Sequence, residues 1–110
     1  MSPPLGEFEQ RILFALMRLG AGVHGLPIRN HLEEQAGRPV SPGALYTALD
    51  RLETRGFVTS RLGEPTAERG GKRKRLYTLR PAGEHAVARL YESMRMMTQG
   101  IGTRLRTLKD

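Results

Sequence analysis

The sequence has 110 residues, the size of a single domain, and leaves no room for a separate catalytic domain. Hydrophobic residues make up 38% of the chain, which predicts a folded core and excludes a disordered tail. The 18 Lys and Arg against 11 Asp and Glu give a formal net charge of +7, which favours a polyanionic partner, and the lack of cysteine excludes disulfides and thiolate metal sites.

The first part of the chain predicts two helices. Apolar residues at three- and four-residue steps predict a helix over residues 5–19 that ends at the glycine-rich segment 20–22. Other apolar residues lie off its main stripe, so we expect part of this helix to face another subunit. A shorter helix is expected over residues 25–36, with Gly37 at its C-terminal cap.

A third helix has a strong start signal. Ser41 can cap free backbone N–H groups, and Pro42 is tolerated at the first helical position. Gly56 supplies the left-handed residue that ends the helix. Its buried stripe is expected to consist of Leu45, Ala48, Leu49 and Leu52.

Beyond this helix the apolar period changes to that of strands. Residues 57–61 and 76–79 predict two strands around a polar, glycine-rich tip, which together form a hairpin. The positive charge gathers here, because residues 55–80 hold eight basic residues against two acidic ones, a net of +6. A solvated turn is the alternative interpretation. We favour phosphate binding, since the basic hairpin follows a capped helix in the order in which wings follow recognition helices.

A last helix is expected from Pro81, with an apolar stripe that continues to Leu108. Gly100 and Gly102 interrupt this stripe, and a glycine in a helix interior costs about 1 kcal/mol against alanine. We therefore expect the helix to fray or bend after Gln99.

The order of these elements defines the expected fold class: mainly α with a small β-hairpin, a winged helix-turn-helix plus a C-terminal dimerisation helix. Residues 1–80 are assigned to the DNA-binding domain and residues 81–110 to the dimerisation helix, within one structural unit.

The candidate DNA-binding residues lie in the third helix and in the hairpin. Small residues at the start of the third helix allow that end to enter a major groove, which brings Thr47 and Arg51 near base edges. Packing against the second helix is the alternative for Tyr46, and a solvent-facing filler is the alternative for Thr47. The predicted DNA-binding residues are Ser41, Gly43, Ala44, Tyr46, Thr47, Arg51, Arg69, Lys72, Arg73, Lys74 and Arg75.

A homodimer is expected, because two recognition helices one DNA turn apart, ~34 Å, double the contacts of one. The stripe on the last helix is the expected interface with the first helix of the partner, and intramolecular core packing is its alternative. The methionines of this stripe could also line an adaptable pocket, although plain packing is favoured. The predicted interface residues are Leu5, Phe8, Ile12, Val87, Leu90, Tyr91, Met94, Met97 and Ile101.

The sequence predicts no enzyme, no metal site and no cofactor. His24 and His31 lie seven residues apart, but no carboxylate pattern completes a zinc site, and His85 is isolated. Nucleophile elbows and phosphate-binding loops are absent. Two other functions remain as alternatives: a sequence-independent nucleic-acid-binding winged-helix protein of nucleoid or RNA-associated type, and a protein-interaction module that uses the methionine stripe.

We expect a cytoplasmic protein without a membrane partner. Residues 1–6 lack the charged and apolar regions of a secretory signal, and no apolar run approaches the ~18 residues of a membrane span.

The run from Ser41 to Val58, with a tyrosine after small residues and then paired leucines, resembles the recognition-helix signature of PadR regulators. Residues 70–79, followed by Gly83, are similar to the wing and second strand of that family, and the resemblance covers roughly residues 5–90. It implies double-stranded DNA as partner, a homodimer on a pseudo-palindromic operator, and usually repression that a small-molecule effector relieves. By position, Tyr46 corresponds to the phosphate-contacting tyrosine of the family.

Two departures from the family pattern concern the last helix and the effector. Arg80 and Pro81 replace the threonine-containing junction common in the family, which alters the cap of the last helix. The chain has no tryptophan, so the aromatic sandwich with which some members bind flat drugs cannot be carried over. The short last helix resembles the smaller subfamily, and the sequence names no effector.

Overall fold

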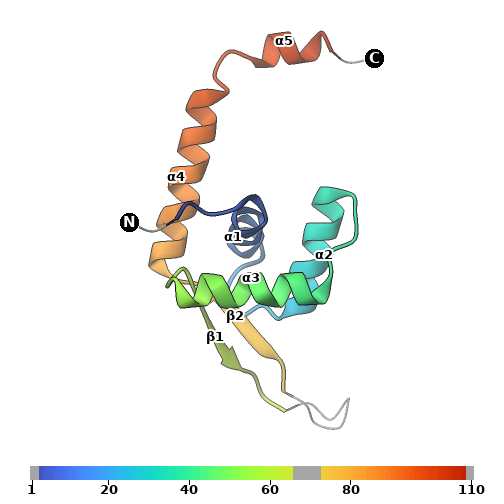
Figure 1. Cartoon of the computed structure of the whole chain (residues 1–110), viewed down its shortest axis with the longest axis vertical. Coiled ribbons are helices and arrows are strands. Elements are labelled where there is room, and N and C mark those ends of the chain that lie inside the picture. Colours follow the sequence, from blue (N-terminus) through green and yellow to red (C-terminus); the bar gives the residue numbers. More distant parts are fainter. Residues whose placement is uncertain (1–2, 66–72, 109–110) are drawn as a thin grey trace.

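The computed structural model describes residues 3–65 and 73–108 of the chain. Five helices and one hairpin make up the described part, and Figure 1 shows α3 above the hairpin, with α1 above α3 and α2 beside the end where α3 begins. The elements are α1 (Glu7–Leu19), α2 (Gly25–Ala36), α3 (Pro42–Thr54), β1 (Val58–Leu62), β2 (Arg75–Leu79), α4 (Pro81–Met97) and α5 (Gly102–Arg106). The expected fold class, mainly α with a small β-hairpin, is confirmed.

Local signals place the end of α2 and both ends of α3, whereas α1 begins at Glu7, two residues later than expected. The Ser41 hydroxyl accepts a hydrogen bond from the Ala44 amide at 3.0 Å, and Pro42 occupies the first turn of α3. Gly37 after α2 and Gly56 after α3 adopt φ values of +68° and +83°, a region that favours glycine. The expected caps are therefore confirmed.

The core joins one face of each of the first three helices to the hairpin and the lower part of α4. Complete burial of a Leu or Ile side chain contributes roughly 1.5–3 kcal/mol, so this cluster is the main source of stability. The cluster consists of Ile12, Leu13, Ala15, Leu16, Ile28, Leu32, Val40, Leu45, Ala48, Leu49, Leu52, Val58, Tyr77, Ala86 and Val87. All four residues of the stripe expected for α3 belong to it.

The core corrects part of the predicted dimer interface. Ile12 is 0% exposed and Val87 is 6% exposed, so both residues pack inside the protomer and offer little or no surface to a partner. Leu5 and Phe8 are partly buried and pack against the same core. The intramolecular alternative therefore holds for the lower end of the stripe, because Ala86 and Val87 of α4 share this core with α1.

The hairpin is held from two sides. Its strands pair antiparallel, with Val58 opposite Leu79 and Ser60 opposite Tyr77. Val23, in the connection between α1 and α2, exchanges two backbone hydrogen bonds with Tyr77, at 3.0 and 2.8 Å. The first connection of the chain therefore fixes the second strand against the helices, a long-range pairing that the sequence did not predict.

The last helix breaks two residues earlier than expected. α4 ends at Met97, and Gly100 adopts a φ of +82° before α5 begins at Gly102. The Thr98 hydroxyl donates to the Met94 carbonyl at 2.7 Å and takes up one of the free carbonyls at this helix end. Figure 1 shows α4 extending beyond the body of the molecule and α5 turning away from its axis. Among the described residues, no helix is long and apolar enough to cross a membrane.

Gly83 marks a close approach between α4 and the start of the hairpin. A Cβ atom added there would lie 2.2 Å from the Phe57 carbonyl oxygen, which is backbone and cannot move aside cheaply. We expect Gly83→Ala to lower the free energy of unfolding by about 2 kcal/mol, in the range of overpacked sites. Urea unfolding followed by circular dichroism measures the change.

The matched control is Gly43→Ala, at a helical glycine with no atom within 4 Å of the added Cβ. This change should stabilise the chain by about 0.5–1 kcal/mol, because alanine is the better helix former. Equal effects of the two substitutions would contradict the close approach at Gly83.

Candidate nucleic-acid interface

Burial of one side of α3 leaves its opposite side in solvent. The four buried residues recur at three- and four-residue steps, so the remaining positions form a continuous exposed face. On α3 and at its N-cap, all the residues predicted to contact DNA are exposed, namely Ser41, Gly43, Ala44, Tyr46, Thr47 and Arg51. The structure therefore brings the predicted helix residues together on the surface.

Tyr46 packs against the beginning of α2. A Cβ atom added to Gly25 would lie 2.1 Å from the Tyr46 hydroxyl oxygen, so the ring fits only because Gly25 has no side chain. Gly25 is buried, whereas Tyr46 remains 44% exposed. Packing against the second helix, the alternative given for this tyrosine, is therefore present in the structure, together with a large exposed fraction.

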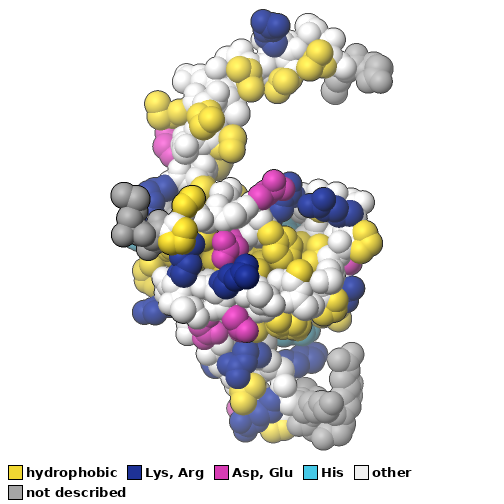
Figure 2. All heavy atoms as spheres, viewed as in Figure 1, with side chains coloured by type: hydrophobic (Ala, Val, Ile, Leu, Met, Phe, Trp, Pro, Cys, Tyr) yellow, Lys and Arg dark blue, Asp and Glu magenta, His cyan; other side chains and the backbone are white. Residues whose placement is uncertain are grey.

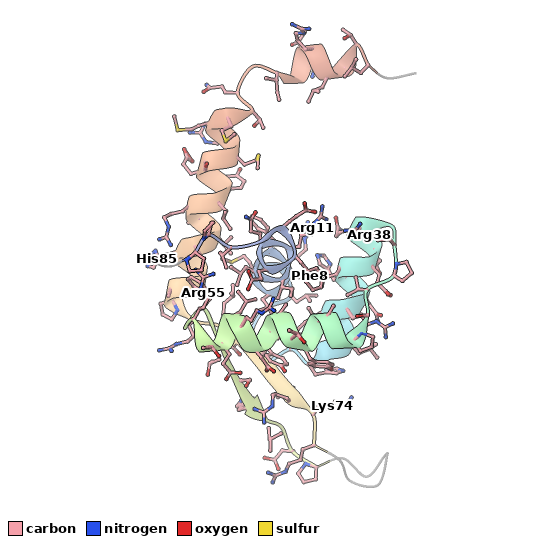
Figure 3. All side chains as sticks on the ribbon, viewed as in Figure 1. Phe8, Arg11, Arg38, Arg55, Lys74 and His85 are labelled. Atoms are coloured by element: carbon pink, nitrogen blue, oxygen red, sulfur yellow. The ribbon has the colours of Figure 1, made fainter. Side chains whose placement is uncertain are left out.

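The basic side chains of the hairpin lie below α3. Figure 2 shows Lys and Arg side chains around the hairpin, with acidic side chains between them and α3. Arg73 and Lys74 are exposed, and Figure 3 places Lys74 on the side of the molecule where α3 begins. Arg69 and Lys72, also predicted to contact DNA, lie outside the described residues.

The basic residues differ in whether they have partners. The side chains of Arg51, Arg73 and Lys74 make no hydrogen bond or ion pair within the described part of the chain. Arg55 instead donates to the Pro3 carbonyl at 2.6 Å and lies 5.2 Å from the centre of the Phe57 ring. Arg55 therefore anchors the beginning of the chain.

The Arg75 side chain also has a hydrogen-bond partner, and this distinguishes it from Arg73 and Lys74. Its guanidinium donates to the Ser60 hydroxyl at 3.1 Å. The Ser60 hydroxyl lies 2.9 and 2.8 Å from the two carboxylate oxygens of Glu53 on α3. A chain of hydrogen bonds thus runs from β2 across β1 to α3.

The N-terminal segment forms the other border of the exposed face of α3. A groove of about 570 Å³ lies between Pro3, Pro4 and the second half of α3. A second groove of about 500 Å³ lies between the first turn of α1 and the first half of α3. Both grooves include Thr47 and Arg51. Sequence patterns did not predict this border, and residues 5 and 6, which were expected in the first helix, precede α1.

Three charged residues on α3 and β1 were not included in the predicted DNA-binding site. Asp50 is exposed on α3, and Glu53 lies at its hairpin side, so α3 itself is not a basic helix. Arg61 is exposed on β1, on the strand face opposite to Ser60. Assigning each charged residue to a helix face or a strand face would have identified them, because the helical and strand repeats determine which face each residue occupies.

The upper part of α4 carries exposed apolar side chains. Figure 2 shows hydrophobic side chains along α4 beyond the body and on α5. Leu90 is partly buried, whereas Tyr91, Met94, Met97 and Ile101 are 64%, 58%, 74% and 41% exposed. These residues lie away from α3, so the structure separates them from the candidate DNA-binding residues.

Histidines and carboxylates form no metal centre in the described ranges, where no group of three or more metal-ligating side chains was found. His24 precedes α2 as its N-cap residue, whereas His31 lies in the middle of that helix, so the two histidines do not share one helix.

Residues 12–89 match the model of the transcriptional regulator PadR-like family. RosR of H. salinarum has a TM-score of 0.74 at 27% identity, with 98% of this chain and 90% of that chain covered. Bacillus subtilis PadR in complex with operator DNA has a TM-score of 0.66 at 24% identity, with 81% of this chain and 48% of that chain covered, which supports the fold alone.

A curated relative is 38% identical over 72 residues, namely an uncharacterized protein of a Streptomyces fradiae transposon. The match takes up 66% of this chain but only 19% of that protein. This chain therefore spans about a fifth of the length of the curated relative.

Tyr77, buried beside this interface, gives a test of the packing under the hairpin. Burial of the ring raises the pKa of its hydroxyl above the ordinary 10.0, and the charge of Asp50 raises it further. Because the folded state favours the protonated hydroxyl, this contribution is complete below pH 10 and is lost as the pH rises through the folded pKa.

We therefore expect the free energy of unfolding to fall above about pH 10 more steeply for the wild type than for Tyr77→Phe. Urea unfolding at a series of alkaline pH values measures both slopes. Parallel curves for the wild type and Tyr77→Phe would show that the hydroxyl is not held in a buried site.

Proposed function

Because this chain belongs to the transcriptional regulator PadR-like family, we propose that it is a sequence-specific DNA-binding regulator that acts as a homodimer. The observation that carries the proposal is the shared surface of α3 and the hairpin. The α3 helix, capped by Ser41, presents small residues at its start and the side chains of Thr47 and Arg51 further along. The hairpin adds the charged side chains of Arg73 and Lys74, which have no partner among the described residues.

The first half of α3 is suited to a major groove. The groove is about 12 Å wide, and an α-helix with side chains is about 10–12 Å across, so small residues at the entering end ease a close approach. Gly43 and Ala44 supply this narrow end. Thr47 and Arg51 then reach base edges, and Asp50 can accept a hydrogen bond from the amino group of a cytosine.

The hairpin supplies the contacts to the backbone of the duplex. Arg73 and Lys74 bind flanking phosphates, because exposed guanidinium and ammonium groups without protein partners displace condensed counterions. Arg69 and Lys72 extend this charge in the same segment. Ser41 and Tyr46 donate hydroxyl hydrogen bonds to phosphates at the beginning of α3. Bacillus subtilis PadR, a protein of the same fold, has been solved in complex with operator DNA.

A second copy of the chain covers the exposed stripe of α4. Gly83, Ala86 and Val87 on this stripe pack inside the protomer, and the same three- and four-residue steps continue upward to Met94 and Met97, which are exposed. Apolar surface of this kind is buried in dimers. The partly exposed Leu5 and Phe8 and the exposed Tyr91 and Ile101 belong to the same proposed interface.

A two-fold dimer places two reading helices on one side of the duplex and requires a pseudo-palindromic site. Occupation of such a site within a promoter excludes the transcription machinery, so we expect repression in the cytoplasm. A small-molecule effector would act by a different affinity for two arrangements of the protomers. The proposal includes no catalytic step, metal or cofactor.

Sequence-independent binding of nucleic acid is the alternative, because charge alone gives affinity without discrimination. Footprinting on the DNA upstream of the chain's own gene separates the two. A protected inverted repeat supports the regulator, whereas uniform protection at every position supports a nucleoid-type or RNA-associated binder. Specific binding should exceed non-specific binding by about 10³ or more.

The wing assignment predicts the effect of removing one phosphate ligand. Arg73→Ala should weaken binding to every duplex sequence and lower the slope of log affinity against log salt by about one. Fluorescence anisotropy over a range of salt concentrations measures both quantities. Arg89→Ala removes an exposed arginine from α4 and should change neither. An unchanged slope for Arg73→Ala would remove this residue from the interface.

The dimer assignment predicts the effect of a charge in the α4 stripe. Met94→Asp should raise the dimer dissociation constant at least about a hundredfold, since an unpaired buried carboxylate costs roughly 3 kcal/mol or more. Sedimentation equilibrium measures the constant. Ala88→Asp places the same charge on the opposite, exposed face of α4 and should leave the dimer intact. Equal behaviour of the two variants would argue against this interface.

A further inference from the structure

Three polar side chains join the hairpin to α3. Glu53 comes from the last turns of α3, Ser60 from the middle of β1, and Arg75 from the first position of β2. The Ser60 hydroxyl has one hydrogen, so it donates to one Glu53 oxygen at a time while its lone pairs accept from Arg75. Each member therefore has a distinct role in one directional chain.

The alternation of side chains in the strands explains why this contact forms. Ser60 lies on the same face of β1 as the buried Val58, which faces the helices, whereas Thr59 and Arg61 lie on the opposite face. Arg75 has the parity of the buried Tyr77 on β2, so it lies on the helix-facing side as well. Arg75 is thus aimed at α3 by the register of the hairpin.

From this geometry we infer that Ser60 and Arg75 are positioning residues that hold the wing against the recognition helix, and that Arg75 is not a phosphate ligand. The inference rests on the proposed DNA-binding function. Arg73 and Lys74, without partners in the described ranges, bind phosphate, while Arg75 stays with Ser60 and Glu53.

Electrostatic interactions explain why Arg75 stays with Ser60 while Arg73 and Lys74 bind phosphate. Glu53 places a carboxylate at the border between α3 and the wing, where a phosphate backbone would pass in the proposed complex. An uncompensated carboxylate there repels phosphates, and the Ser60 hydrogen bond and the Arg75 charge offset it. Arg75 is exposed and its contact is screened by water, so the expected effect on affinity is several-fold rather than orders of magnitude.

The test compares salt dependence and additivity in the full-length chain, with a fluorescein-labelled random-sequence duplex as the probe. Arg75→Ala and Ser60→Ala should each weaken binding by about three- to tenfold with nearly unchanged salt slopes. The double variant should be no weaker than either single variant, because both break the same chain of contacts. Ser60→Thr, which keeps the hydroxyl, should restore binding.

Two further variants separate this inference from the proposed function. Thr59→Ala, at an exposed neighbour on the other strand face, should leave binding unchanged. Arg73→Ala should lower the salt slope by about one, and its failure to do so would count against the wing function itself. The opposite result is that Arg75→Ala lowers the salt slope by about one, with a loss of binding free energy that adds to the loss caused by Ser60→Ala. That result would make Arg75 a phosphate ligand, and the inference would be wrong. Unchanged binding by both single variants, with circular dichroism confirming the fold, would also overturn it.

Discussion

The buried leucine stripe of α3 is the contact on which the rest of the molecule depends. Leu45, Leu49 and Leu52 are 0–1% exposed, and they attach α3 to the core along its whole length. Because a helix so attached cannot rotate, its opposite face stays in solvent with a defined set of side chains. The same core includes Val58 and Tyr77 of the hairpin, so α3 and the hairpin pack against the same buried residues.

The charge of the interface is divided between these two elements. α3 carries Asp50, Arg51 and Glu53 and is therefore close to neutral, whereas the unpartnered positive charge lies on the wing. In the proposed complex this separates the two tasks of a DNA-binding protein, since phosphate contacts position the protein and base contacts give specificity. In the proposed assembly the upper part of α4 serves a third task, dimerisation, and it lies away from both.

Much of the fold could be predicted because its signals are local. Ser41 and Pro42 mark the start of α3, and Gly37, Gly56 and Gly100 mark helix ends by their backbone conformation. Contacts between distant segments could not be predicted, such as the pairing of Val23 with Tyr77. Ile12 and Val87 were wrongly assigned to a dimer interface, because periodicity shows that a stripe is buried but not which partner buries it. The partner of Arg75 was missed for a similar reason, since the strand register was unknown.

The central claim is that α3 and the wing form one surface for B-form DNA. A nuclear magnetic resonance titration tests it most directly, with the nitrogen-15-labelled full chain and a duplex from upstream of its own gene. The account predicts that the backbone amides of residues 41, 43–51 and 73–75 shift on binding, whereas those of residues 10–18 in α1 do not. Binding accompanied by shifts confined to α1 or α4, with α3 and the wing unchanged, would contradict the account.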